Sequence, residues 1–102
     1  MKKYIVFWEW NKEDTEKGIE KAKKIDELRK QEPEKYPKSL GSSYGILGSD
    51  VKYHGFTLFE ANEKQLKEWE EFYKPVLRIT KKKHIISAAK FIEKYEKKEL
   101  IL

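Results

Sequence analysis

The segment Lys3–Trp10 constrains the fold more than any other part of the chain. It reads Lys-Tyr-Ile-Val-Phe-Trp-Glu-Trp, and a run of β-branched and aromatic residues is typical of a strand. Successive side chains of a strand point to opposite faces. Tyr4 and Val6 therefore share one face, while Ile5 and Phe7 share the other. Because both faces are apolar, a sheet built on this strand needs cover on both sides.

Two amphipathic helices are predicted. Between Thr15 and Gln31, apolar residues recur at helical spacing, with Asp14 or Thr15 as the cap. These apolar positions are Ile19, Ala22, Ile25 and Leu28. Gly18 weakens the first turns by about 1 kcal/mol relative to alanine.

The second helix has sharper boundary signals. Asn62 and Gln65 form a variant of the capping box at its start. Pro75 ends it, because the residue before a proline is pushed toward extended geometry. The apolar face of this helix carries Leu66, Trp69, Phe72 and Tyr73.

Three further strands and a last helix complete the pattern. Strands are expected at Ser42–Leu47 and Tyr53–Ala61, joined by a turn at Gly48-Ser-Asp50. Pro33 and Pro37 are expected to hold residues 32–38 out of helix and sheet. A fourth strand at Val76–Thr80, a polar connection at Lys81–Lys83 and a helix at Ser87–Lys98 follow, with an apolar tail at Leu100–Leu102.

The expected element order is β-α-β-β-α-β with an additional C-terminal helix. This is the ferredoxin-like, or split βαβ, arrangement of the α+β class, with one antiparallel sheet and both crossover helices on one face. We expect a single domain over residues 1–102, with a ferredoxin-like core at 1–80 and an extension carrying the helix at 81–102.

The second sheet face then needs a partner. In the strand Tyr53–Ala61, Phe56 and Leu58 share one face, so this strand also offers apolar residues on both sides. Two kinds of cover are open: a second copy of the chain packed sheet against sheet, or the terminal helix folded back. Large apolar patches rarely stay exposed, and a homodimer is expected through the open sheet face.

Composition narrows the class of protein. The chain has 102 residues, of which 40% are charged, with a net charge of +5 and no cysteine. Disulfides, thiol catalysis and thiolate metal sites are therefore excluded. No apolar run reaches the roughly 18 residues of a membrane span. The start of the chain lacks a signal-peptide pattern, so we expect a cytoplasmic domain with no membrane association.

The excess of Lys and Glu has two interpretations. With two Asn, two Gln and no Cys, it matches proteins of hot environments. It equally matches an AT-rich genome.

Four segments together resemble one known group of proteins. They are the strand Met1–Trp10, the turn Tyr44–Gly48, the run Gly55–Ala61 leading into the helix that bears Trp69, and the segment Tyr73–Ile79. The group consists of short, uncharacterised prokaryotic proteins of the dimeric α+β barrel superfamily. The resemblance covers roughly residues 1–95 and rests on element order and residue character. The first helix and the loop after it are longer here than is usual in that group.

The resemblance implies a homodimer whose two sheets close into a barrel, often with a cavity under each sheet. Relatives in the superfamily include cofactor-free monooxygenases, haem-degrading enzymes, muconolactone isomerases and stress-response proteins. Because the closest group has no sharp catalytic signature, membership says more about fold than about function.

A ligand pocket is predicted at the end of the first strand. The third strand runs antiparallel to the first, so Trp8, Trp10 and Asn11 should lie near His54 and Phe56. Such mixed apolar and polar corners are typical of small-molecule pockets. Resemblance to the monooxygenases makes His54 a candidate acid or base and Asn11 a polar anchor. The alternative is a surface histidine beside ordinary core aromatics.

Two charged residues complete the candidates. Glu60 ends an apolar strand where the resembling group often has an acidic residue, and a carboxylate with a raised pKa could act as a base. Arg78 could hold an anionic group across a sheet face. Each has a simpler interpretation as a surface side chain. Haem ligation by His54 or His84 is supported only by analogy with some relatives. The sequence shows no cluster of metal-ligating residues. We therefore expect no cofactor.

Nucleic-acid binding is an alternative because the RNA-recognition fold has the same element order. The segment His54–Ala61 echoes the RNA-binding consensus, but His54, Leu58 and Ala61 depart from it at key positions. Glu9 would repel phosphate. Nucleic acid is therefore not expected as a partner.

The function predicted from sequence is binding, or slow transformation, of a small apolar organic molecule by a homodimer without a tightly bound cofactor. The alternatives are a structural or regulatory interaction module without catalysis and an RNA-binding domain.

Overall fold

The computed structural model describes residues 1–48 and 51–99. Within them, five strands and three α-helices form a mixed α+β fold, which confirms the class expected from sequence. In chain order, the elements are β1 (Lys2–Asn11), a 3-10 turn η1 (Lys12–Asp14), α1 (Thr15–Gln31), β2 (Lys38–Ser39), β3 (Tyr44–Ile46), β4 (Lys52–Ala61), α2 (Glu63–Tyr73), β5 (Arg78–Ile85) and α3 (Ala88–Glu96).

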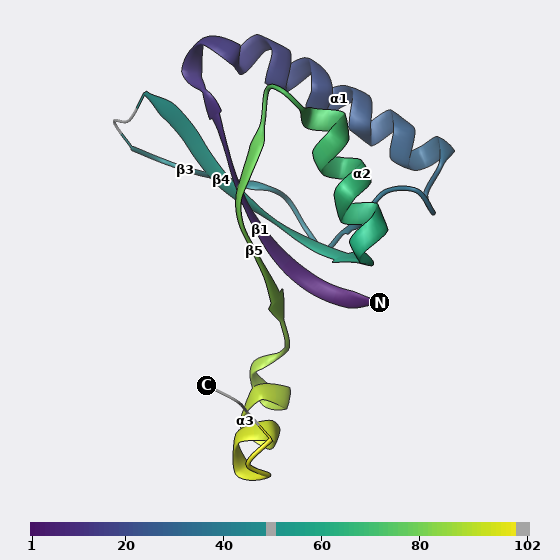
Figure 1. The fold of residues 1–102 in the computed structure, drawn as a ribbon, viewed down its shortest axis with the longest axis vertical. Helices are drawn as coiled ribbons and strands as arrows, with labels where there is room; N and C mark the ends of the chain where they lie inside the picture. Colours follow the sequence, from purple (N-terminus) through teal and green to yellow (C-terminus); the bar gives the residue numbers. More distant parts are fainter. Residues whose placement is uncertain (49–50, 100–102) are drawn as a thin grey trace.

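The strands form one antiparallel sheet centred on β1, with β4 and β5 on its two sides (Figure 1). The short strands β2 and β3 both pair with the outer edge of β4. The register sets Phe7 opposite Phe56 and Glu9 opposite His54. The expected neighbourhood of the end of the first strand and the start of β4 is thus confirmed.

Helices α1 and α2 lie on the same side of the sheet, which we call the covered face (Figure 1). Val6 of β1 and Phe59 of β4 point into this layer and are 0% exposed. Ile25 of α1 and Leu66 and Trp69 of α2 close the core from the helical side. Each fully buried large side chain of this kind contributes about 1.5–3 kcal/mol to folding, so the core at this face is what holds the two helices on the sheet.

Two tryptophan rings on the covered face pack directly against the backbone of a glycine. Trp8 lies against Gly55, where an added Cβ would overlap its ring, and its Nε1 donates to Thr57 Oγ1 at 3.1 Å. Trp10 lies against Gly18 of α1, where a Cβ would stand 3.0 Å from the ring. The helix therefore keeps a glycine in its first turns in spite of the cost predicted above, since any side chain there would push the indole away.

The opposite side of the sheet, the open face, carries the alternate residues of the same strands. From β1 and β4 these are Ile5, Phe7, Glu9, Lys52, His54, Phe56, Leu58 and Glu60. Tyr44 of β3 stacks on Phe56 with ring centroids 5.1 Å apart, and Phe7 lies 5.9 Å from Phe56 on the other side. No helix of the described residues packs on this face (Figure 1).

Strand β5 differs from the prediction. The sequence indicated a strand at Val76–Thr80 and a polar connection at Lys81–Lys83, but β5 begins at Arg78 and continues to Ile85. The connection was wrong because the long edge of β1 offers pairing partners as far as Lys3. Lysines suit this place, since charged side chains on an edge strand discourage pairing with another chain.

A bulge at Thr80 shifts the β1–β5 register. Ile79 lies opposite Trp8, whereas Lys81 lies opposite Phe7. As a result, Lys81 faces the open side. Lys82 faces the covered side, where its Nζ donates to Glu63 Oε2 at 2.8 Å.

The segment between α1 and β4 also differs from the prediction. The strand expected at Ser42–Leu47 is shorter, as β3, and Lys38–Ser39 forms the unpredicted strand β2. Lys38 pairs with Glu60 directly after Pro37, so the proline limits the strand at its start without preventing it. Of the expected turn at Gly48-Ser-Asp50, the last two residues lie outside the described part of the chain.

Most helix boundaries are confirmed. Helix α1 covers the expected Thr15–Gln31, although Ile19, predicted on its buried side, is 46% exposed. The capping box is formed, with Gln65 N donating to Asn62 Oδ1 at 2.8 Å and Asn62 N donating to Gln65 Oε1 at 3.0 Å. Helix α2 ends at Tyr73, as expected ahead of Pro75.

Helix α3 projects away from the sheet at the end of β5 (Figure 1). Ser87 caps it by accepting from Lys90 N at 3.2 Å, and none of its residues is buried. Phe91, Ile92 and Tyr95 are 48%, 55% and 66% exposed. The alternative in which this helix folds back over its own sheet is therefore not the arrangement seen. The tail Leu100–Leu102 lies outside the described residues.

Candidate functional site

A charged cluster surrounds Glu9 at one end of the open face. Neighbouring strands supply its members, because Glu9 lies opposite His54 of β4 and Arg78 of β5. Arg78 Nη2 donates to Glu9 Oε1 at 2.6 Å, and Lys52 Nζ donates to the same oxygen at 3.3 Å. His54 Nδ1 lies 3.6 Å from Glu9 Oε2. We call these four residues the Glu9 cluster.

The electrostatics of the cluster favour an ionised Glu9. Only 13% of its side chain is exposed, and this burial raises the pKa of the carboxyl group. Hydrogen bonds from Lys52 and Arg78 outweigh burial, so the pKa lies below its ordinary value of 4.5. One buried carboxylate thus orders two longer cations, which leaves an excess of positive charge around it.

A shallow hollow of about 330 Å³ adjoins the cluster. Trp10, Asn11 and Arg78 line it with Lys52, Pro75 and Val76. The volume is at the lower end of the range for small-molecule sites, roughly 300–1,000 Å³. Two cationic side chains at its rim suit a ligand with an anionic group.

The structure brings some of the predicted site residues together and separates others. Trp10, Asn11 and Arg78 share the hollow, and His54 stands beside it in the Glu9 cluster. Trp8 points to the covered face and hydrogen-bonds Thr57, so the sheet separates it from His54.

The remaining two predicted residues lie on the open face. Phe56 lies on the same side of the sheet as His54, two positions along β4. Glu60 is also on β4, about 20 Å from His54 at the usual strand rise. Within one chain it is not part of this group, and it pairs across the sheet with Lys3 and Lys38.

Reasoning from the sequence missed Glu9 and Lys52 as members of the site. Glu9 was noted only as a charge that would repel phosphate. The signal that could have found the pair was register: once His54 is placed opposite Glu9, the alternation of a strand puts both on one face. Lys52 lies on the same face, because it precedes His54 by two positions in β4.

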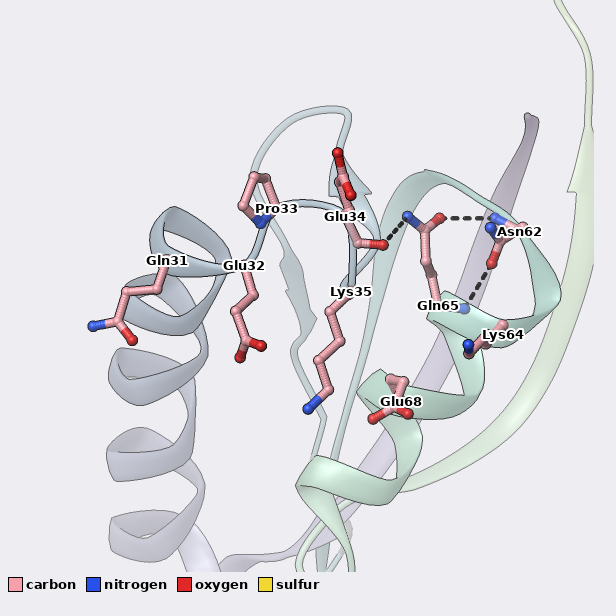
Figure 2. A pocket seen from close by; sticks show the side chains of 9 residues that line it. All are labelled: Gln31, Glu32, Pro33, Glu34, Lys35, Asn62, Lys64, Gln65 and Glu68. Carbon is pink, nitrogen blue, oxygen red and sulfur yellow. Dashed lines mark hydrogen bonds between the residues drawn. The ribbon is translucent and has the colours of Figure 1, made fainter.

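A larger hollow of about 620 Å³ lies between the end of α1 and the start of α2 (Figure 2). Its two amide side chains at the start of α2 have partners: Gln65 Nε2 donates to the Glu34 carbonyl at 3.0 Å, and Gln65 takes part in the capping box with Asn62. Lys35 and Glu68 at its wall carry opposite charges (Figure 2). These contacts hold the loop after α1 on α2, and neither of the buried polar atoms that lack a partner in the described residues lines this hollow.

Residues 1–48 and 51–99 contain no group of three histidine or acidic side chains arranged to hold a metal ion. Nor does any helix in that part of the chain have the length and apolar character needed to cross a membrane.

Comparison of the chain with protein-family models, with curated proteins and with solved structures finds no match.

Proposed function

We propose that this protein is a homodimer of the ferredoxin-like, dimeric α+β barrel kind, which binds a small organic molecule at the Glu9 end of its open face. The observation that carries the proposal is the open face itself. Its centre is apolar, with Ile5, Phe7, Phe56 and Leu58 side by side, and the described chain supplies nothing to cover it.

The strand order supports the ferredoxin-like assignment. Read across the sheet, the last strand β5 is followed by β1, then β4, then β2 and β3. Treating β2 and β3 as one interrupted strand gives the order expected for the split βαβ arrangement, with helices on a single face.

The surface area supports a partner chain. The accessible surface is 7691 Å², whereas a compact monomer of 12.3 kDa exposes about 6,100 Å². The excess of about 1,600 Å² is roughly twice what each partner buries in a standard interface. The radius of gyration, 15.4 Å, also exceeds the roughly 12.8 Å of a compact chain of this length.

The ligand part of the proposal rests on the hollow beside the Glu9 cluster. Arg78 and Lys52 would hold an anionic group there, since guanidinium and ammonium groups form charge-assisted hydrogen bonds with carboxylates. The ring of Trp10, which lines the same hollow, would contact the apolar body. His54 would be the group that transfers a proton, because of its place beside Glu9. No tightly bound cofactor is part of the proposal.

Sedimentation equilibrium over a range of concentrations tests the dimer. We expect a mass of about twice 12.3 kDa for the wild-type chain. Leu58→Glu should shift the mass toward the monomer, because a charge would enter the apolar centre. The matched control Ile19→Glu changes an exposed apolar residue on α1 and should leave the dimer intact.

A wild-type chain that stays monomeric at all concentrations would overturn the dimer. Titration with single-stranded RNA would then test whether Phe7, Phe56 and Tyr44 on the open face stack bases, as in the RNA-recognition fold.

Calorimetry with benzoate and its neutral analogue benzamide tests the ligand part. Benzoate should bind more tightly to the wild-type protein, and Arg78→Gln should remove that preference. Lys97→Gln, an exposed change in the segment after α3, is the control. Equal binding of the two compounds would contradict an anion site here.

A further inference from the structure

Two exposed apolar surfaces, at opposite ends of the sheet, are not explained by packing of the open faces alone. One is the stripe on α3 formed by Ala88, Phe91, Ile92 and Tyr95, which recur at helical spacing. The other is at the β3–β4 hairpin, where Tyr44 and Ile46 on the open face and the neighbouring Leu47 and Val51 are all exposed, Leu47 fully. We call them the α3 stripe and the hairpin patch.

In the structure the two surfaces of one chain do not meet. The α3 stripe follows Ile85 of β5, which pairs with Lys3 at one end of β1. The hairpin patch belongs to the other end, because Ile46 pairs with His54, which in turn lies opposite Glu9. A helix of nine residues is about 14 Å long, and α3 points away from the sheet (Figure 1).

We propose that α3 is an exchanged arm: its apolar stripe packs on the hairpin patch of a second copy of this chain. The proposal rests on the homodimer proposed above and adds the segment that completes its interface. In a dimer with two-fold symmetry the contact would be made twice, because α3 of each chain would pack on the hairpin patch of the other.

Charge on the open face favours the orientation that makes this contact possible. If the strands of the two sheets run antiparallel, the Lys3 end of each chain faces the Glu9 end of the other. Lys3 then approaches the buried carboxylate of Glu9, and Glu60 approaches the cations Lys52 and Arg78. If the strands run parallel, each Glu9 cluster meets its own copy, so the two pairs of cations face each other.

That antiparallel orientation carries α3 of one chain to the hairpin end of the other. The apolar rows of the open face, Ile5 with Leu58 and Phe7 with Phe56, remain at the centre of the interface. The α3 stripe and the hairpin patch extend the same interface at each end. Together these regions account for an exposed surface larger than a face-to-face contact of standard size needs.

Disulfide trapping tests the contact directly, because the chain contains no cysteine of its own. One sample carries Ile92→Cys and the other Ile46→Cys, and the two are mixed, allowed to exchange subunits and oxidised. We expect a cross-linked species containing one chain of each kind. The matched control replaces Ile46→Cys by Ile19→Cys, an exposed apolar position on α1, and should give little cross-link.

Polar substitution in α3 gives a second readout. The double variant Phe91→Ser, Ile92→Ser should raise the dimer dissociation constant about tenfold or more, as expected when apolar anchors are lost from an interface. The control Lys90→Ser, Lys94→Ser alters the same helix outside its apolar stripe and should change the constant by less than about threefold.

The outcomes separate this inference from the dimer itself. A wild-type monomer contradicts the homodimer. A stable wild-type dimer with no Ile92–Ile46 cross-link, and with unchanged affinity in the Phe91 and Ile92 variant, overturns the arm alone. A chain that carries both Ile46→Cys and Ile92→Cys gives one more check: a cross-link that forms within this chain, and not between chains, also overturns the arm, because α3 would then fold back on its own sheet.

Discussion

The same two strands, β1 and β4, supply residues to both the covered and the open face of the sheet, but the two faces differ in how deeply these residues are buried. Val6 and Phe59 are completely buried under α1 and α2, while Phe7 and Phe56, equally apolar, remain half-buried on the other side. The difference lies in the cover available and not in the residues. An apolar pattern on a strand therefore predicts that a sheet face will be buried, but it does not predict whether the same chain or a second chain buries it.

The largest expected effect separates the two faces by concentration dependence. Phe59→Ala removes a fully buried ring and should lower the free energy of unfolding by about 3–5 kcal/mol, whatever the protein concentration. Phe56→Ala should have its main effect through the dimer, and that effect should shrink on dilution. Urea unfolding at two concentrations measures both. Equal, concentration-independent losses would remove the distinction between the faces.

The polar pair inside the covered face comes next. Thr57→Val leaves Trp8 Nε1 buried without its acceptor, which should cost about 1–3 kcal/mol of unfolding free energy. Ser43→Ala, which removes only the other neighbour of the Thr57 hydroxyl, at 2.7 Å, serves as the control and should cost less. Comparable losses for the two variants would mean that the tryptophan bond contributes little.

The attachment of α2 to the covered face can be weakened from its first turn. Asn62→Ala removes the side chain that accepts from Gln65 N, and we expect a loss of about 1 kcal/mol in unfolding free energy. Asn62→Asp retains an acceptor and should restore most of it. If both variants unfold alike, the cap is not what stabilises the start of α2.

The smallest effect concerns the open face and appears only in acid. The folded pKa of Glu9 is lowered, so its ionised form stabilises the fold above the unfolded pKa. This contribution is lost as the pH falls through the folded value. Between about pH 5 and pH 3, Glu9→Gln should therefore lose stability less steeply than the wild type. Arg78→Gln should also flatten the profile, whereas parallel profiles would argue against the proposed pairing.

Much of the covered face could be predicted from sequence because local signals set it. Helical spacing in Thr15–Gln31 and the capping box at Asn62 and Gln65 placed both helices correctly. The extent of β5 could not be predicted in the same way. Lys81–Lys83 has the character of a loop, and only the free edge of β1 turns it into a strand.

The candidate site shows the same division. Alternation and antiparallel pairing correctly placed His54 near the end of β1, but the expected pocket combined side chains from both faces. Trp8 and His54 lie in register close to one another, yet they point to opposite sides of the sheet. Their separation depends on which set of alternate strand residues faces the helices. Contacts between residues distant in sequence decide this.

The bulge at Thr80 has a consequence for how this chain can change in evolution. Arg78 and Lys81 are an odd number of residues apart and still share a face, because the extra residue resets the alternation between them. Deletion of Thr80 would convert the bulge into regular pairing, with Arg78 still opposite Glu9 and Lys81 still opposite Phe7, so every later position of the strand would keep its face. Lys82 would stay on the covered face, where it can keep its bond to Glu63, and Lys81 and Lys83 would stay on the open face. The bulge is thus a point at which this edge strand can lose one residue without moving its charged side chains to the other face.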